Sequence, residues 1–157
     1  MDAQRRGELI DRYREGTSAV EEALQGLDEA DLDRRPPDGG WTARQVVHHL
    51  GDSEMMSAMR LRRLLAEERA TIHGYDEAEF ARKLYYDTRP IEPSLNAMRA
   101  ARESTATLLN ELSEEDWSRT GTHTESGPYS VETWLEIYAR HAHDHADQIR
   151  RAGRGEE

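Results

Sequence analysis

The chain has 157 residues, 36% of them hydrophobic and 34% charged, and a net charge of -11. This length suits a single domain over residues 1–157 with one core, and the acidic balance argues against a general nucleic-acid binder, which needs a basic face. The absence of cysteine excludes disulfides, zinc–thiolate sites and a cysteine nucleophile. Because we find neither a secretion signal nor an apolar run of roughly 20 residues, we expect a cytoplasmic protein without a membrane partner.

Apolar residues recur at the three-and-four spacing of amphipathic helices in four segments. The first segment is marked by Ile10, Tyr13, Thr17, Val20, Leu24 and Leu27. In the second, Thr42 can cap a helix while Gln45 reaches back to it, and Trp41 and Val46 occupy the positions of a hydrophobic staple. We expect this second helix to run to about Glu68.

The third helix is predicted to open at Pro93, a favourable first-turn residue. The fourth follows Ser130, a suitable N-cap, and Gly153 is expected to end it. The segment GTHTESGPYS (121–130) can form a short hairpin, and about 24 residues connect helices two and three. The sequence therefore predicts an all-α four-helix bundle with one long crossover between helices two and three.

Three of the seven histidines lie in HAHDHADQI (141–149). His141 and His145 are four residues apart and share one face of the predicted helix, whereas His143 is expected to face solvent. This spacing is that of zinc-binding helices, but two imidazoles rarely hold a metal well without a third ligand. Either His48 or His49 of the second helix can supply it, and periodicity does not separate them. Three histidines would leave one coordination position open for water or substrate.

Four segments carry a resemblance to a known family: GGWTARQVVHHLGDSE (39–54), YDEAEF (75–80), PSL (93–95) and YARHAHDHADQI (138–149). The chain resembles the DinB/YfiT-like superfamily of metal-binding four-helix bundles, in particular its YfiT-like branch of metal-dependent hydrolases. The resemblance implies metal ligation by His49, His141 and His145, with His48 as the substitute. Two positions depart from the family pattern: Gly51 stands where alanine is commoner, and Gln148 where a close relative has histidine.

The resemblance also implies chemistry: hydrolysis, or thiol S-transfer with bacillithiol or mycothiol as a co-substrate, on a small molecule. Zinc and nickel are the expected metals, and homodimerisation is expected because related bundles often pair. The same set of metal ligands serves several reactions in this superfamily, so the fold and the ligands do not identify the substrate. The alternative is a non-catalytic metal-binding bundle that acts as a stress-response or binding protein.

Two residues near the predicted ligands are candidates for catalysis. Glu54 falls on the apolar stripe of the second helix, where an unpaired charge is costly, so it pairs with an arginine, forms a hydrogen bond across the bundle, or serves as a general base. Tyr138 lies one turn before His141 and either bonds a metal-bound water or substrate, or packs in the core. Asp52 and Asp144 are candidates to orient a ligating imidazole, against the simpler interpretation of solvated carboxylates.

Overall fold

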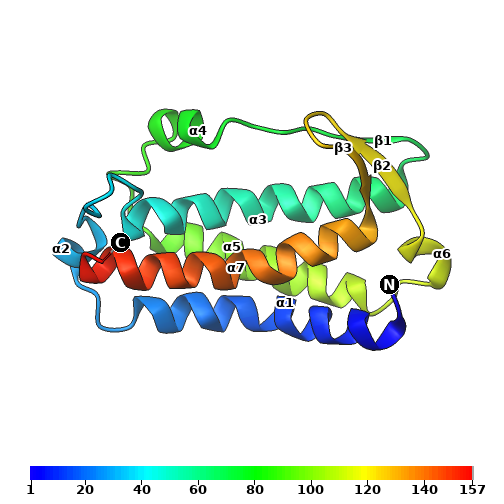
Figure 1. The fold of residues 1–157 in the computed structure, drawn as a ribbon, viewed down its shortest axis with the longest axis horizontal. Helices are drawn as coiled ribbons and strands as arrows, with labels where there is room; N and C mark the ends of the chain where they lie inside the picture. The colour runs from blue at the N-terminus through cyan, green and yellow to red at the C-terminus, as the bar shows by residue number, and fades with distance from the viewer. Residues whose placement is uncertain (157) are drawn as a thin grey trace.

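The computed structural model describes residues 1–156, and four long helices form its bundle (Figure 1). They are α1 (Ala3–Leu24), α3 (Ala43–Ala66), α5 (Glu92–Leu109) and α7 (Val131–Arg154). α1 and α7 run in one direction, and α3 and α5 run in the other (Figure 1). The crossover from α3 to α5 returns along the length of the bundle and carries β1 (Ala70–Ile72) and α4 (Glu77–Lys83). The predicted four-helix bundle with a long crossover is confirmed.

The helix starts agree closely with the sequence signals. Thr42 accepts a hydrogen bond from the Gln45 amide while the Gln45 side chain returns to the Thr42 amide, which is the predicted capping box. Ser130 caps α7, as predicted. The predicted stop at Gly153 is wrong, because α7 continues to Arg154 and ends at Gly155, whose φ of 70° is the left-handed conformation of a helix C-cap.

A small sheet lies at one end of the bundle. β2 (Thr120–His123) and β3 (Gly127–Ser130) form the predicted hairpin, and β1 pairs with β2 in parallel, Ala70 opposite Gly121. β1 was not predicted, because three residues are too few to display a two-residue period. Two short helices, α2 (Glu29–Leu32) and α6 (Glu114–Trp117), complete the connections.

A polar layer divides the apolar core into two clusters. One cluster, around Leu61 and Trp134, lies towards the sheet, and the other, around Leu50 and Ile149, lies towards α2. Between them the bundle buries the polar side chains of Ser53, Glu54, Ser57, Arg102 and Thr105. Buried polar groups are costly unless they are paired, so this layer marks the part of the bundle whose sequence is not explained by packing.

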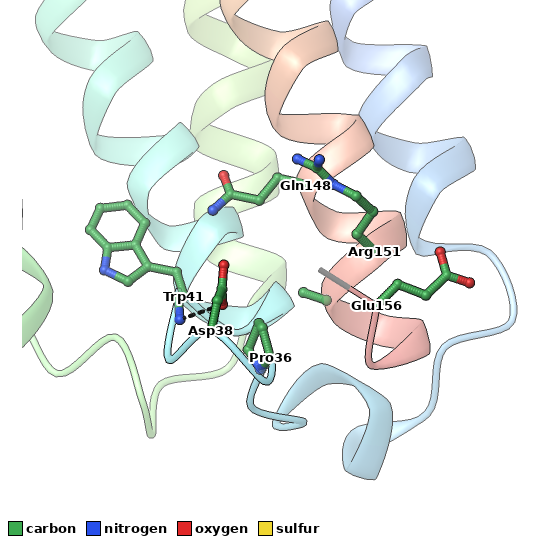
Figure 2. Close-up of a pocket in the computed structure, with 8 residues that line it drawn as sticks. Pro36, Asp38, Trp41, Gln148, Arg151 and Glu156 are labelled. Carbon is green, nitrogen blue, oxygen red and sulfur yellow. Dashed lines mark hydrogen bonds between the residues drawn. The ribbon is translucent and has the colours of Figure 1, made fainter.

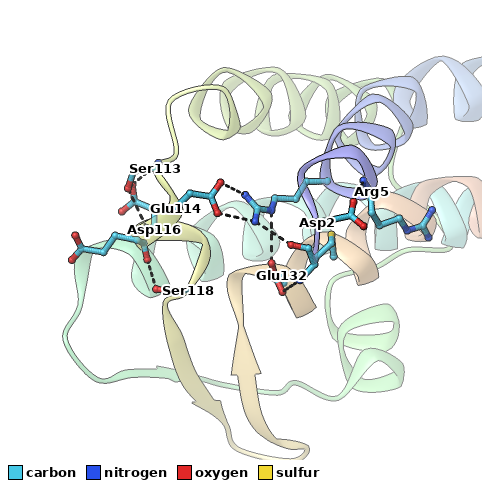
Figure 3. A network of polar contacts seen from close by, with 10 residues as sticks. Asp2, Arg5, Ser113, Glu114, Asp116, Ser118 and Glu132 are labelled. Atoms are coloured by element: carbon cyan, nitrogen blue, oxygen red, sulfur yellow. Dashed lines mark hydrogen bonds and ion pairs between the residues drawn. The ribbon is translucent and has the colours of Figure 1, made fainter.

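The N-terminus is fixed by a polar network at the sheet end of the bundle (Figure 3). Arg6 donates hydrogen bonds to both carboxylate oxygens of Glu114 in α6, and the Met1 ammonium group lies 3.0 Å from the carboxylate of Glu132 in α7. These contacts set the position of the first turn of α1. Among the described residues, no helix combines the length and apolar character needed to cross a bilayer.

Candidate metal centre

Three histidines meet between α3 and α7. His49 comes from the second turn of α3, and His141 and His145 project from adjacent turns of α7. One ring nitrogen from each lies within 4.8 Å of the other two. The Nε2 atoms of His49 and His141 are 3.3 Å apart. The structure thus brings together the His141/His145 pair that the helix spacing selected and His49, which the family resemblance selected.

One of the three separations between these nitrogens equals the separation expected around a small cation. Zinc–nitrogen bonds of about 2.0–2.1 Å in a tetrahedron put neighbouring nitrogens about 3.3–3.4 Å apart. The separation of the His49 and His141 Nε2 atoms is 3.3 Å. Two imidazole nitrogens at this distance share either a proton or a cation, because two lone pairs repel one another. The donor set therefore fits a divalent metal.

All three imidazoles are held in the neutral form that binds metals. Burial lowers the pKa of His49 to about 3, and the neighbouring His145 adds to the shift. Burial, followed by the other two histidines, also brings the pKa of His141 well below its usual value. Burial lowers the pKa of His145, although its hydrogen bond to Gln148 opposes the shift. At neutral pH each ring keeps a lone pair available.

His48, the alternative ligand that periodicity left open, has both ring nitrogens engaged elsewhere. Its Nε2 lies 3.0 Å from the carbonyl oxygen of Arg89, and its Nδ1 lies 2.8 Å from Oγ of Ser94. A carbonyl only accepts, so Nε2 donates and Nδ1 accepts from the serine hydroxyl. His48 thus fastens the end of the crossover and the start of α5 to α3.

The remaining histidines lie outside the cluster. His143 points away from it, as predicted, and is partly exposed, with its Nε2 2.9 Å from the Arg12 carbonyl of α1. His73 is exposed in the crossover, and Nδ1 of His123 accepts hydrogen bonds from the amides of Glu125 and Ser126. None of these three belongs to the group that the structure forms from His49, His141 and His145.

The two candidate catalytic residues, Glu54 and Tyr138, are both buried next to His141. Glu54 is 0% exposed and forms an ion pair with Arg102, as one of the sequence interpretations required. Tyr138 is also buried, and its ring meets that of His141 edge-on at 5.7 Å. The Tyr138 hydroxyl accepts a hydrogen bond of 2.8 Å from Arg60, a residue that sequence reasoning did not select. Burial raises the pKa of Tyr138, so its hydroxyl is protonated at neutral pH.

The carboxylates proposed to orient the ligands have other surroundings. Asp52 accepts a hydrogen bond from the hydroxyl of Tyr86, a crossover residue, and Asp144 is exposed. The simpler interpretation therefore suits Asp144, whereas Asp52 holds the crossover. The group that does contact a histidine of the cluster is Gln148, whose Oε1 lies 2.7 Å from Nδ1 of His145. Its spacing of three residues on the same helix was a signal that the sequence analysis could have used.

A pocket of about 130 Å³ opens beside the cluster at the α2 end of the bundle (Figure 2). Trp41 and Gln148 form part of its wall, together with Asp38, Arg151 and Glu156. The Trp41 ring also packs on His49, with centroids 5.1 Å apart. Because Trp41 and Gln148 each touch a histidine of the cluster, this pocket borders the candidate metal centre.

Comparison with known proteins identifies the family of the chain. The sequence model of the DinB superfamily matches residues 12–149. The chain belongs to this superfamily. A protein of Oceanobacillus iheyensis named "Putative metal-dependent hydrolase OB0782" is 42% identical over 123 residues, which cover 78% of this chain and 71% of the relative. A protein of Geobacillus thermodenitrificans named as the same kind of hydrolase is 38% identical over 71% of this chain and 63% of its own length.

Solved structures share the fold. YfiT from Bacillus subtilis, described as a probable metal-dependent hydrolase with an unusual four-helix bundle topology, superposes with a TM-score of 0.91 at 29% identity. That match covers 98% of this chain and 89% of YfiT. A mycothiol-dependent maleylpyruvate isomerase superposes with a TM-score of 0.74 at 19% identity, over 92% of this chain and 60% of the isomerase. At that identity the likeness concerns the fold alone.

Proposed function

We propose that His49, His141 and His145 bind one divalent cation and that the protein is a metal-dependent enzyme acting on a small molecule. The observation that carries this proposal is the convergence of three neutral imidazoles with ring nitrogens within 4.8 Å of one another. Imidazole suits zinc, nickel, iron and copper, of which zinc and nickel are the ions we favour. Three protein ligands are typical of catalytic zinc sites, which keep a position for water or substrate.

A divalent cation at this centre would supply Lewis acidity and lower the pKa of a water or thiol that reaches it. The surrounding residues supply binding and orientation. Gln148 fixes the ring of His145, while Arg60 and the Tyr138 hydroxyl can bond a polar group of the substrate. Trp41 covers one side of His49 and limits access of bulk water.

Hydrolysis is the reaction we propose first, because relatives at 42% and 38% identity carry the name of metal-dependent hydrolases. Thiol transfer is the second candidate, and its support is the fold shared with a mycothiol-dependent isomerase. In that case a low-molecular-weight thiol, such as bacillithiol or mycothiol, would be the co-substrate. The two reactions differ in whether water or a thiol is the nucleophile.

The first experiment is elemental analysis of the untagged protein, in wild type and in His49→Ala, His145→Ala and His143→Ala variants. We expect about one equivalent of zinc or nickel in wild type and in His143→Ala, and loss of metal in the other two with the helical circular dichroism retained. Wild-type protein that stays metal-free after either ion is offered would overturn the proposal. Loaded protein would then be screened for hydrolysis of amide and ester libraries, with and without thiols.

A loaded protein with no turnover in these screens would favour the alternative, a non-catalytic metal-binding bundle with a stress-response or binding function. We further propose that the chain folds as one domain and pairs as a homodimer. A single thermal transition and light scattering after gel filtration test these two points. Two separate transitions would contradict the first, and the mass of a single chain would contradict the second.

A further inference from the structure

An ion pair is buried behind the histidine cluster. Arg102 of α5 donates an Nη1 hydrogen bond to Oε1 of Glu54 in α3, and the two side chains are 2% and 0% exposed. The guanidinium group also donates to the carbonyl oxygens of Tyr13 in α1 and Tyr138 in α7. It therefore joins all four long helices. Burying two charges costs desolvation energy that a packed apolar pair would avoid, so stability alone is a poor explanation for this pair.

The bundle is built around this guanidinium group. A Cβ atom on Gly16 of α1 would lie only 2.6 Å from Nη2 of Arg102, so the glycine leaves the room that the side chain needs. The ring of Tyr13 lies against the guanidinium group, and its centroid is 4.0 Å from Cζ of Arg102. Arg102 is thus held in place by packing as well as by hydrogen bonds, and it fixes the carboxylate of Glu54 in turn.

The carboxylate faces the back of one member of the cluster. Oε1 of Glu54 lies 4.0 Å from Nδ1 of His141, whereas Nε2 of His141 faces His49 at 3.3 Å. Within residues 1–156, neither Nδ1 of His141 nor Oε2 of Glu54 has a hydrogen-bond partner, and both atoms are buried. A neutral imidazole carries its proton on one nitrogen only. A carboxylate beside Nδ1 favours the proton there and leaves the lone pair on Nε2.

We propose that Glu54 is a positioning residue: held by Arg102, it keeps His141 as the Nδ1–H tautomer with the Nε2 lone pair directed at the metal. This inference rests on the proposed metal centre. It gives Glu54 a different role from that of a general base, because the fully buried carboxylate lies behind the ring and not at the open side of the site. The role parallels that of Gln148 towards His145, because a side-chain oxygen faces Nδ1 of each α7 imidazole, at 2.7 Å for Gln148 and 4.0 Å for Glu54.

The test combines metal affinity with a direct view of the tautomer. Glu54→Gln keeps the shape of the side chain and removes its charge. Zinc affinity is measured by competition with a chelating dye, and the protonated nitrogen of His141 by long-range ¹H–¹⁵N spectra of the metal-free protein. We expect wild type to show the Nδ1–H form, and the variant to show a mixture of tautomers and to bind zinc about 10- to 100-fold more weakly.

Two further variants separate positioning from folding. The single variant Glu54→Gln leaves the charge of Arg102 buried and unpaired. The double variant Glu54→Gln/Arg102→Met removes this charge. We expect the double variant to be more thermally stable than Glu54→Gln but to bind zinc equally weakly. Leu61→Ala cuts a buried α3 side chain away from the cluster, and we expect it to lower the melting temperature while zinc affinity is kept. Equal zinc loss in Leu61→Ala would overturn the positioning role.

The outcomes also separate this inference from the proposed function. Wild-type protein that binds neither zinc nor nickel would refute the metal centre, while the His141 tautomer in the metal-free protein would still report on Glu54. Wild-type protein that binds zinc, with an equally tight Glu54→Gln variant in the same Nδ1–H tautomer, would refute the role of Glu54 and leave the metal centre intact.

Discussion

Nδ1 of His145 lies 2.7 Å from Oε1 of Gln148, one turn further along α7. An amide oxygen only accepts hydrogen bonds, so the imidazole donates its Nδ1–H and keeps the lone pair of Nε2 for the cluster. Acceptors of this kind orient metal-bound histidines and raise the basicity of the ligating nitrogen. The glutamine that departs from the family pattern is therefore in direct contact with a proposed ligand.

Replacement of Gln148 by leucine should weaken metal binding without unfolding the bundle. The variant keeps a side chain of comparable size but has no acceptor for His145, and we expect zinc affinity to fall about tenfold. Chelator competition measures the change, and Asp147→Ala, an exposed neighbour, is the control. An unchanged affinity in Gln148→Leu would mean that the contact does not orient the ring.

The two adjacent histidines of α3 should respond differently to substitution. His49→Ala is expected to lose the metal, whereas His48→Ala should keep it, because both nitrogens of His48 bond the crossover and α5. Loss of these two buried bonds should lower the free energy of unfolding by about 1–3 kcal/mol. Metal content and urea denaturation of both variants check the assignment. Metal loss from His48→Ala with its helices intact would contradict the assignment, because it would make His48 a metal ligand.

The difference between His48 and His49 shows where sequence reasoning ends. Helix periodicity gave the four helices and the shared face of His141 and His145, because these depend on neighbours three or four residues away. The two α3 histidines lie at similar angles from the apolar stripe, and their roles are decided by Arg89 and Ser94, more than 40 residues later in the chain. No local pattern encodes such a contact; only the resemblance to a family favoured His49.

The pairing of Glu54 was predictable only in kind. Its position on an apolar stripe predicts a partner such as an arginine, but the chain contains many arginines, and α5 alone contains two. The choice of Arg102 follows from the way α5 packs between α1 and α3. The predicted end of α7 at Gly153 is wrong for a related reason. Gly153 is buried against Leu27, where a Cβ would come within 2.8 Å, so it serves packing and not helix termination.

Substitution of Gly51 by alanine should destabilise the protein, although alanine is the better helix former. A Cβ atom at this position would lie 2.9 Å from both the Cβ and the carbonyl oxygen of Ser94, so α5 would have to move away from α3. We expect a loss of about 1–3 kcal/mol in the free energy of unfolding, measured by urea denaturation. Gly7→Ala is the matched control, because nothing lies within 4 Å of its added Cβ. It should gain roughly 0.5–1 kcal/mol.

Tyr138→Phe tests the hydroxyl that Arg60 holds near the cluster. The variant keeps the ring that packs against His141 and Trp134, so metal content and melting temperature should be unchanged. We expect kcat for a substrate found in the hydrolase screen to fall about tenfold, the value of one hydrogen bond of about 1.4 kcal/mol in the transition state. An unchanged kcat would show that Tyr138 only packs.

The stability of the metal-free protein should depend on pH through its neutral histidines. The pKa of His49 is about 3 in the folded protein, against 6.5 when it is solvated. Between these values the unfolded chain binds a proton that the folded chain does not, so the free energy of unfolding falls as the pH falls. The slope approaches about 1.4 kcal/mol per pH unit for each such imidazole, and His141 and His145, whose pKa values are also lowered, add to it.

Urea denaturation of chelator-treated protein between pH 7 and pH 5 measures this slope, in a range above the titration of most carboxylates. Removing one titrating ring with His49→Gln should reduce the slope by up to about 1.4 kcal/mol per pH unit, because the unfolded variant has one proton fewer to bind. His143→Gln removes a histidine outside the cluster and serves as the control. A His49→Gln slope equal to that of wild type would mean that His49 is protonated in the folded protein at pH 5, and that the three rings do not form a neutral set of metal ligands.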